Sequence, residues 1–334
     1  MTAMKASLSN ASWAWLSTRL NYVPFIVVGL ILVALPSFLP SYLQGIISKV
    51  LIFAIFAISL NLLNGYTGLF SLGHAAYFGA AAYTSGVLIV KLGIENFWIV
   101  APTGILMATF IASIFGFIAL RVSGIYFLFV TLALGQLLSY IAIKWASVTG
   151  GSDGLVITGY PYLGFSSFSM TATSFYYLVF IIFAISFFLL YRLIVSPFGV
   201  ALQGIRESET RMRSMGYNTW LYKYIAFVIA GLFAGVAGVL FLYHVKVIIP
   251  TNLGVLTSTL VMLMVVSGSD RVFWGPCIGA VIIVLLEHYS SIYSPERWPL
   301  ILGGFFIITV MFLRGGISIY WLKLWKRRKL LWKH

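Results

Sequence analysis

The chain has 334 residues, of which 61% are hydrophobic and only 8% are charged, and its mean hydropathy is +1.03. A soluble fold of this composition would have too few polar side chains to cover its surface, so we expect one membrane domain over 1–334 without an appended soluble domain. The net charge of +14 suits an anionic lipid surface better than a nucleic acid, because the basic residues lie in short loops and in a tail beside apolar runs.

Apolar runs recur along the whole chain, and crossing a bilayer as a helix takes about 20 residues. The first run is followed by no small-residue cleavage site, which predicts a retained helix. We therefore predict an all-α polytopic membrane protein with about ten transmembrane helices. The expected spans are 24–40, 45–63, 70–90, 97–120, 124–143, 174–192, 224–243, 253–268, 273–290 and 298–314.

The basic residues predict the orientation of these spans. With the N-terminus inside, sixteen Lys and Arg fall in inner segments and four in outer ones, Lys91, Lys144, Lys246 and Arg297. Lys49 lies near the outer end of the second span, where it can reach the interface. Because short loops rich in Lys and Arg stay in the cytoplasm, we expect both termini inside, a periplasmic loop at 144–172 and a basic cytoplasmic tail at 318–334.

A glycine-rich stretch, GYTGLFSLGHAAYFG at 65–79, opens the third span. Its small residues favour close helix packing, and the alternative is an unwound helix start that lines a cavity. His74 either belongs to a substrate pathway or packs with one hydrogen bond. The candidate pathway residues are Asn64, Tyr66, Ser71, His74 and Gln136.

The segment 196–218 holds five charges in a chain that has few. As one helix over 197–216, ended by Gly216, it separates an apolar stripe from a charged face. The stripe is Ala201, Ile205, Ser208, Met212 and Met215, and the charged face is Arg206, Glu207, Glu209, Arg211 and Arg213. Such a helix lies along the inner membrane surface, either as a plain connector or as a docking site for a soluble partner.

The remaining spans carry little chemistry. Two small-xxx-small pairs, 231–235 and 275–279, predict tight helix pairing within the chain or with a second, related membrane chain. Asp153 is expected in a turn, with helix capping or contact with a partner protein as alternatives. No acidic residue is expected near the middle of a span, which favours an external energy source over ion coupling. We find no catalytic constellation, metal-spaced cluster or phosphate-binding loop, and expect Cys277 to be a small buried hydrophobe.

The sequence SPFGVALQGIRE at 196–207 resembles the coupling loop of ABC-importer permeases of the branched-chain amino acid family. The strict family pattern has a glutamate six residues before the glycine, whereas here Thr210 stands six before Gly216 and Glu209 one earlier. Further segments resemble the family in its order: 65–79, then LRVSGIYFLFVTLA at 120–133 with TGGSDGL at 149–155, and finally VVSG at 265–268 with WGPCIGA at 274–280 and FLRGGI at 312–317. The M-type permease of the family fits best.

This resemblance implies a multi-pass protein of the bacterial inner membrane that imports branched-chain or related amino acids. It also implies a second permease subunit, two ATPase subunits that bind ATP and Mg²⁺, and a periplasmic binding protein, with no cofactor on this chain. The implied ATPase-coupling residues are Ala201, Ile205, Arg206, Glu207, Glu209, Arg211, Met212 and Gly216. Import of urea or short amides, a self-sufficient ion-coupled secondary transporter and a membrane-embedded enzyme acting on lipid remain alternatives.

Overall fold

The computed structural model describes residues 22–162, 171–293, 296–312 and 315–318. Helices lie at all the expected spans: α2 (Tyr22–Ala34) with η1 (Leu35–Ser37), α3 (Ser41–Asn61) with the π-helix η2 (Leu62–Thr67), α4 (Ala75–Val90), α5 (Phe97–Ala119), α6 (Ile125–Lys144), α8 (Ala172–Val195), α11 (Thr219–Val245), α12 (Val255–Gly268), α13 (Gly275–Tyr293) and α14 (Trp298–Phe312). Shorter elements are α7 (Ala146–Thr149), η3 (Gly151–Asp153), β1 (Leu155–Val156), α9 (Pro197–Glu207), α10 (Glu209–Ser214), β2 (Val247–Ile248) and η4 (Pro250–Leu253).

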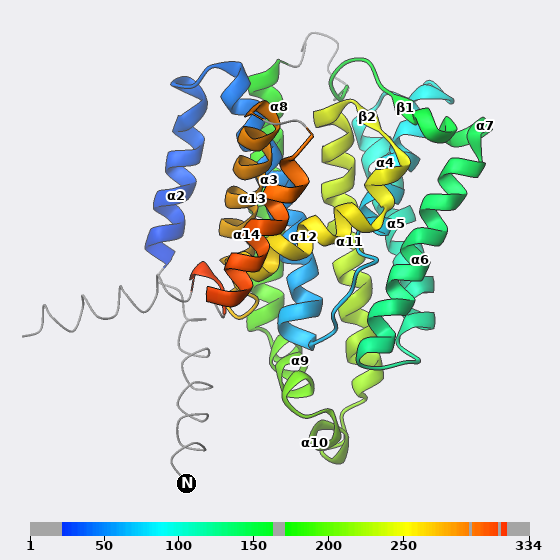
Figure 1. Ribbon diagram of the computed structural model, residues 1–334, viewed down its shortest axis with the longest axis vertical. Coiled ribbons are helices and arrows are strands. Elements are labelled where there is room, and N and C mark those ends of the chain that lie inside the picture. Colours follow the sequence, from blue (N-terminus) through cyan, green and yellow to red (C-terminus); the bar gives the residue numbers. More distant parts are fainter. Residues whose placement is uncertain (1–21, 163–170, 294–295, 313–314, 319–334) are drawn as a thin grey trace, which may run out of the picture.

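The long helices run between two ends of one bundle (Figure 1). We call the end with β1 and β2 the outer end and the end with α9 and α10 the inner end, after the orientation predicted above. Among the described helices, six are long and apolar enough to cross a membrane, and α2, α4, α12 and α14 are shorter. The all-α polytopic fold is therefore confirmed, and the count of ten crossings stays a prediction.

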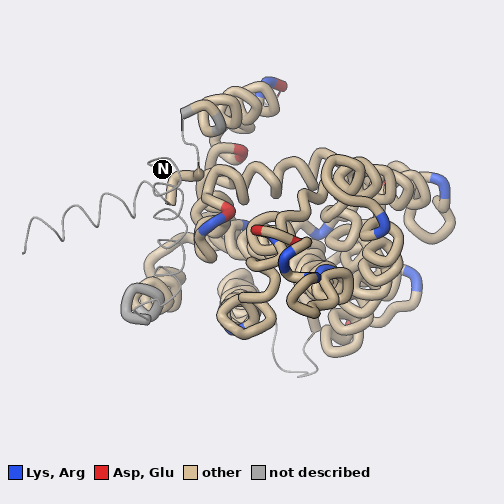
Figure 2. The backbone as a smooth tube through the Cα atoms, turned by 90° about the horizontal axis from the view of Figure 1, so that it is seen from below, with Lys and Arg blue, Asp and Glu red and all other residues tan. Residues whose placement is uncertain are grey.

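The predicted orientation rests largely on residues outside the described part of the chain. Lys5, Arg19, Arg314 and the basic tail residues from Lys323 to Lys333 all fall there, as does part of the 144–172 loop. Viewed from the inner end, the described bundle shows only a few charged positions (Figure 2). Cytoplasmic termini accordingly stay a prediction.

Helices α3 and α11 form the centre of the bundle. In the most apolar 18-residue stretch of each helix, 78% of the residues are buried for α3 with η2 and 72% for α11, against 22% for α8. Aromatic rings fill the space between α3, α4 and α11, with the Phe56 and Phe78 centroids 4.4 Å apart and Phe241 5.0 Å from Phe78. Side-chain caps start several helices, since Asn96, Thr171 and Asn218 each accept a hydrogen bond from a backbone N–H in the first turn.

Both small-xxx-small pairs form helix crossings within this chain. A Cβ on Gly231 would overlap the Ala112 side chain of α5, and one on Gly235 would overlap Ala108. A Cβ on Gly279 would overlap the Met264 carbonyl of α12, so the α12 and α13 backbones touch directly. These contacts confirm the tight pairing and place it inside the chain.

The outer end is closed by the antiparallel pair β1–β2, with Leu155 opposite Ile248. Gly154 precedes β1 with φ 73, and a Cβ there would overlap the Ile248 carbonyl, so the approach of the two segments requires glycine. Asp153 is exposed at the end of η3, as the turn interpretation predicted.

An ion pair joins α3 and α13 toward the outer end. The Nζ atom of Lys49 lies 3.1 Å from Glu287 Oε2, and the two side chains are 26% and 21% exposed. Next to them, the Tyr42 hydroxyl bonds to His288 Nε2. Lys49 and Glu287 thus partner each other rather than extending separately to the interface.

Candidate functional site

The segment between α8 and α11 forms two helices, so the single helix predicted over 197–216 is wrong. Ser208 breaks it with an extended backbone, φ −160 and ψ 98, and its side chain caps α10 by accepting from the Arg211 N–H. Serine favours such a cap over a helix interior because its hydroxyl competes for backbone hydrogen bonds. Gly216, with φ 89, ends the segment where expected.

The apolar stripe is confirmed for three of its members. Ala201, Ile205 and Met212 are buried together against Tyr222. The Met212 sulfur packs on Gly204, which holds α10 against α9. Met215 is 66% exposed and does not belong to this cluster.

Glu209 fastens α10 to the start of α11. Its carboxylate pairs with Lys223 and lies 2.7 Å from Arg213 Nη2, and the Thr219 hydroxyl donates to it over 3.0 Å. Burial alone would raise the pKa of Glu209, but the Lys223 hydrogen bond and charge, with the bonds from Thr219 and Arg213, lower it. The network therefore stabilises the fold above the ordinary carboxyl pKa and is lost as the pH falls through the lowered value.

We expect Glu209→Gln to loosen α10. The lost charge costs about 1 kcal/mol after allowing for partial exposure, which lowers the unfolding midpoint at pH 7 by about 2–4 °C. Trypsin should then cleave faster after Arg211 and Arg213, and the midpoint difference should disappear in acid. The matched control is Glu207→Gln, because Glu207 is exposed. Equal midpoints for both variants would remove this role from Glu209.

Arg206 points inward rather than toward a partner. Its guanidinium donates to the Gly65 carbonyl of η2 and lies 3.1 Å from Asp270 Oδ2, in the turn between α12 and α13. Its aliphatic stem packs on Gly68, whose φ of 74 favours glycine. We call these four residues, Gly65, Gly68, Arg206 and Asp270, the inner junction. It links α9 to η2 at the end of α3 and to the turn between α12 and α13.

The charged face is therefore smaller than predicted. Arg206 and Glu209 have partners within the chain, whereas Glu207 and Arg211 are exposed and form no ion pair among the described residues. Together with the exposed residues Thr210 and Met215 they form the part of the segment's exposed surface that we call the docking surface.

Four of the five candidate pathway residues lie inside the bundle. Asn64, Tyr66, Ser71 and His74 are 5% exposed or less, and only Gln136 on α6 is half-buried. His74 stacks on Phe56 and contacts the Ser59 hydroxyl over 2.9 Å, as in its packing interpretation. Their role in a pathway stays a prediction.

The close packing expected of the glycine-rich stretch is confirmed, and the stretch also has the unwound helix start of the alternative; a cavity lined by it stays a prediction. Residues 68–74 form no helix, so α4 has an irregular start, and Gly73 also packs directly on the Thr131 carbonyl of α6. The side-chain amides of Asn61 and Asn64 have no hydrogen-bond partner among the described residues.

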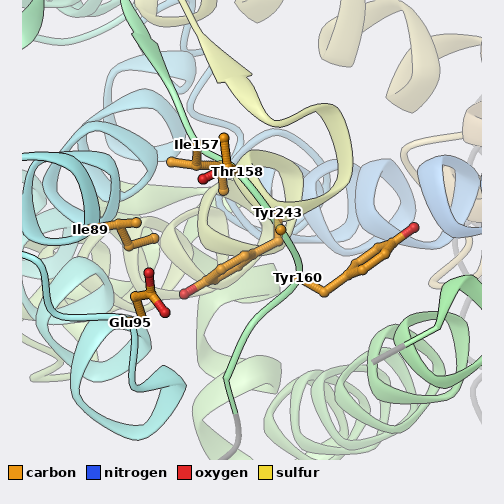
Figure 3. Close-up of a pocket in the computed structure, with 7 residues that line it drawn as sticks. Ile89, Glu95, Ile157, Thr158, Tyr160 and Tyr243 are labelled. Carbon is orange, nitrogen blue, oxygen red and sulfur yellow. The ribbon is translucent and has the colours of Figure 1, made fainter. Parts of the chain in front are cut away.

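A small pocket at the outer end lies between the 91–96 loop, the segment after β1 and the end of α11 (Figure 3). The Tyr243 hydroxyl points toward the Glu95 carboxylate in this pocket. Tyr160 also lines the pocket, and Lys246 Nζ lies over its ring, 4.4 Å from the ring centre. In the described ranges no cluster of three or more His, Cys, Asp or Glu residues could hold a metal ion.

Comparison with known proteins shows which family the chain resembles. The sequence model of a family described as "Branched-chain amino acid transport system / permease component" matches residues 42–312. The chain is 28% identical over 316 residues to the high-affinity branched-chain amino acid transport system permease protein LivM of Escherichia coli K12, covering 88% of this chain and 74% of that protein. It is 26% identical over 285 residues to LivH of Salmonella typhimurium, a permease protein of the same description, covering 79% and 90%. No solved structure matches the chain.

Proposed function

The chain belongs to the family of permease components of branched-chain amino acid transport systems, and we propose that it is one permease subunit of a bacterial ABC importer for branched-chain or related amino acids. Similarity to both LivM and LivH supports pairing with a second, related permease. The apolar helices and the family place it in the membrane as a multi-pass protein, and we infer the inner membrane from the transporter type.

ATPase subunits supply the energy in this proposal, and the docking surface is where they bind. The observation that carries it is the inner junction: a segment with an exposed, charged surface is fixed by Arg206 to η2 and to the α12–α13 turn. Movement imposed on α9 would therefore reach the transmembrane helices. ATP and Mg²⁺ belong to the partner subunits, and a periplasmic binding protein delivers the amino acid at the outer end.

Charge reversal at the docking surface tests the proposal. We expect Glu207→Lys with Arg211→Glu to release the ATPase subunits and to reduce uptake about tenfold or more, because like charges would then face each other across the interface. The control is Lys91→Glu, a charge reversal of the same size as each single change in the double variant, on an exposed residue toward the outer end. If the double variant still binds the ATPase subunits and takes up substrate at the parent rate, docking at this surface is refuted.

The alternatives predict different results in liposomes. Uptake driven by an ion gradient, with only this chain present, would establish a secondary transporter. Lipid turnover by the purified chain would establish an enzyme. Thermal-shift screening of the binding protein against leucine, valine, urea and short amides would distinguish the substrates.

A further inference from the structure

Residues 68–72, which we call the gate segment, form neither helix nor strand and lie in the inner half of the bundle. They follow η2 and run between α12 and α6 from the inner end toward the start of α4 (Figure 1). The Leu72 N–H donates a hydrogen bond to Thr131 Oγ1 of α6 over 3.3 Å. The Ala75 N–H, at the start of α4, donates to Ser258 Oγ of α12 over 3.0 Å.

The backbone of the gate segment is incompletely paired. The Leu69 N–H bonds to the Leu63 carbonyl over 3.0 Å, but within the described residues the N–H groups of Phe70 and Ser71 have no hydrogen-bond partner. Backbone without internal partners occurs at membrane depth only where protein or water satisfies it. Ser71 is buried within the chain, whereas Phe70 is 46% exposed, so we expect water or a partner protein rather than lipid beside the Phe70 backbone.

The open side presents an apolar surface beside polar groups. Phe70 is 46% exposed and Leu72 is half-buried. The polar residue Gln136 of α6 is also half-buried, and its neighbour Gly135 lies against Gly73. An amino acid with an apolar side chain has the same mixture of chemistry, with the side chain suited to the Phe70 ring and the carboxylate to the unpaired Phe70 N–H.

The start of the gate segment is also its link to α9. Gly68 packs on the Arg206 stem, and Gly65, three residues earlier, receives the guanidinium. We propose that residues 68–72 form the inner gate of a water-filled substrate path, with the second permease opposite, and that Arg206 is the positioning residue that moves this gate with α9. The inference rests on the proposed importer function.

Thiol labelling tests whether the gate segment faces water. Cys277 is the only native cysteine, so Phe70→Cys in a Cys277→Ser background is a single-site probe. In inside-out vesicles containing the whole transporter, we expect a membrane-impermeant methanethiosulfonate to label it about tenfold faster than Phe110→Cys, a 59% exposed site on α5. Equal rates, or reaction only with a lipid-soluble maleimide, would overturn the gate.

Nucleotide dependence tests the link. Trapping the ATPases with ATP and vanadate should change the labelling rate of Phe70→Cys at least about threefold, and Arg206→Met should abolish that change while the ATPases stay bound. Asp270→Asn, which removes only the ion pair, is the second variant and should reduce it. The link is refuted if vanadate trapping does not change the labelling rate in the parent, or if it changes the rate equally in the parent and in both variants.

The labelling experiment does not depend on transport. A water-accessible Phe70→Cys site combined with ion-driven uptake would therefore refute the importer proposal and leave the gate proposal intact.

Discussion

Gly279→Ala should prevent stable packing of α12 against α13. The added methyl group would overlap the Met264 carbonyl, and a backbone atom cannot move aside by changing rotamer. Relief requires separating the two helices, at a cost of about 3 kcal/mol or more. Because α13 also packs on the central helix α3, the loss would spread to the middle of the bundle. Detergent-solubilised protein should show a lower unfolding midpoint and more aggregate in size-exclusion chromatography.

The control for this variant is Gly303→Ala. Gly303 also lies within an apolar helix, α14, but a Cβ there meets nothing within 4 Å. Its unfolding midpoint should equal that of the parent protein. Matching midpoints for Gly279→Ala and Gly303→Ala would mean that the α12–α13 contact is looser than the structure shows.

Lys49→Met should have the second largest effect on stability. It leaves the Glu287 carboxylate, 21% exposed, without its cation in an apolar helix pair. Breaking a fully buried pair costs about 3–5 kcal/mol, and the partial exposure here lowers our expectation to about 2 kcal/mol. The midpoint of thermal unfolding should fall by several degrees at pH 7.

A second substitution separates the charge effect from lost packing. Glu287→Gln in the Lys49→Met background removes the uncompensated charge, so the double variant should be more stable than Lys49→Met alone. If it is less stable by the sum of the single effects, the two residues do not act as a pair.

Local patterns were sufficient for the parts of this fold that depend on neighbours in sequence. Hydropathy located the helices, and four-residue spacing located the glycine crossings at 231–235 and 275–279. The break at Ser208 was missed because the helical periodicity of the sequence continues through it. A serine can either continue a helix or cap the next one, and the periodicity does not show that Ser208 accepts a capping hydrogen bond from the Arg211 N–H.

The candidate site needed information that periodicity does not contain. Arg206 bonds to Gly65, 141 positions away, and to Asp270, 64 positions away, and nothing in the local charge pattern indicates such partners. The same holds for Glu209 and Lys223, which are 14 positions apart. The burial of Ala201 and Ile205 was predictable from helical spacing within α9, and Leu202, three residues before Ile205, is buried at the same spacing. Met212 joins this cluster from α10, across the break at Ser208, which spacing alone does not predict.

The separate anchoring of α9 and α10 has a mechanical consequence. On one side of Ser208, Arg206 fixes α9 to η2 and the α12–α13 turn; on the other, Glu209 fixes α10 to the start of α11. A displacement of this segment would therefore reach the transmembrane helices at two separate places, through Arg206 at η2 and the α12–α13 turn and through Glu209 at the start of α11. Ser208, with its extended backbone, is the residue that joins these two connections in the chain.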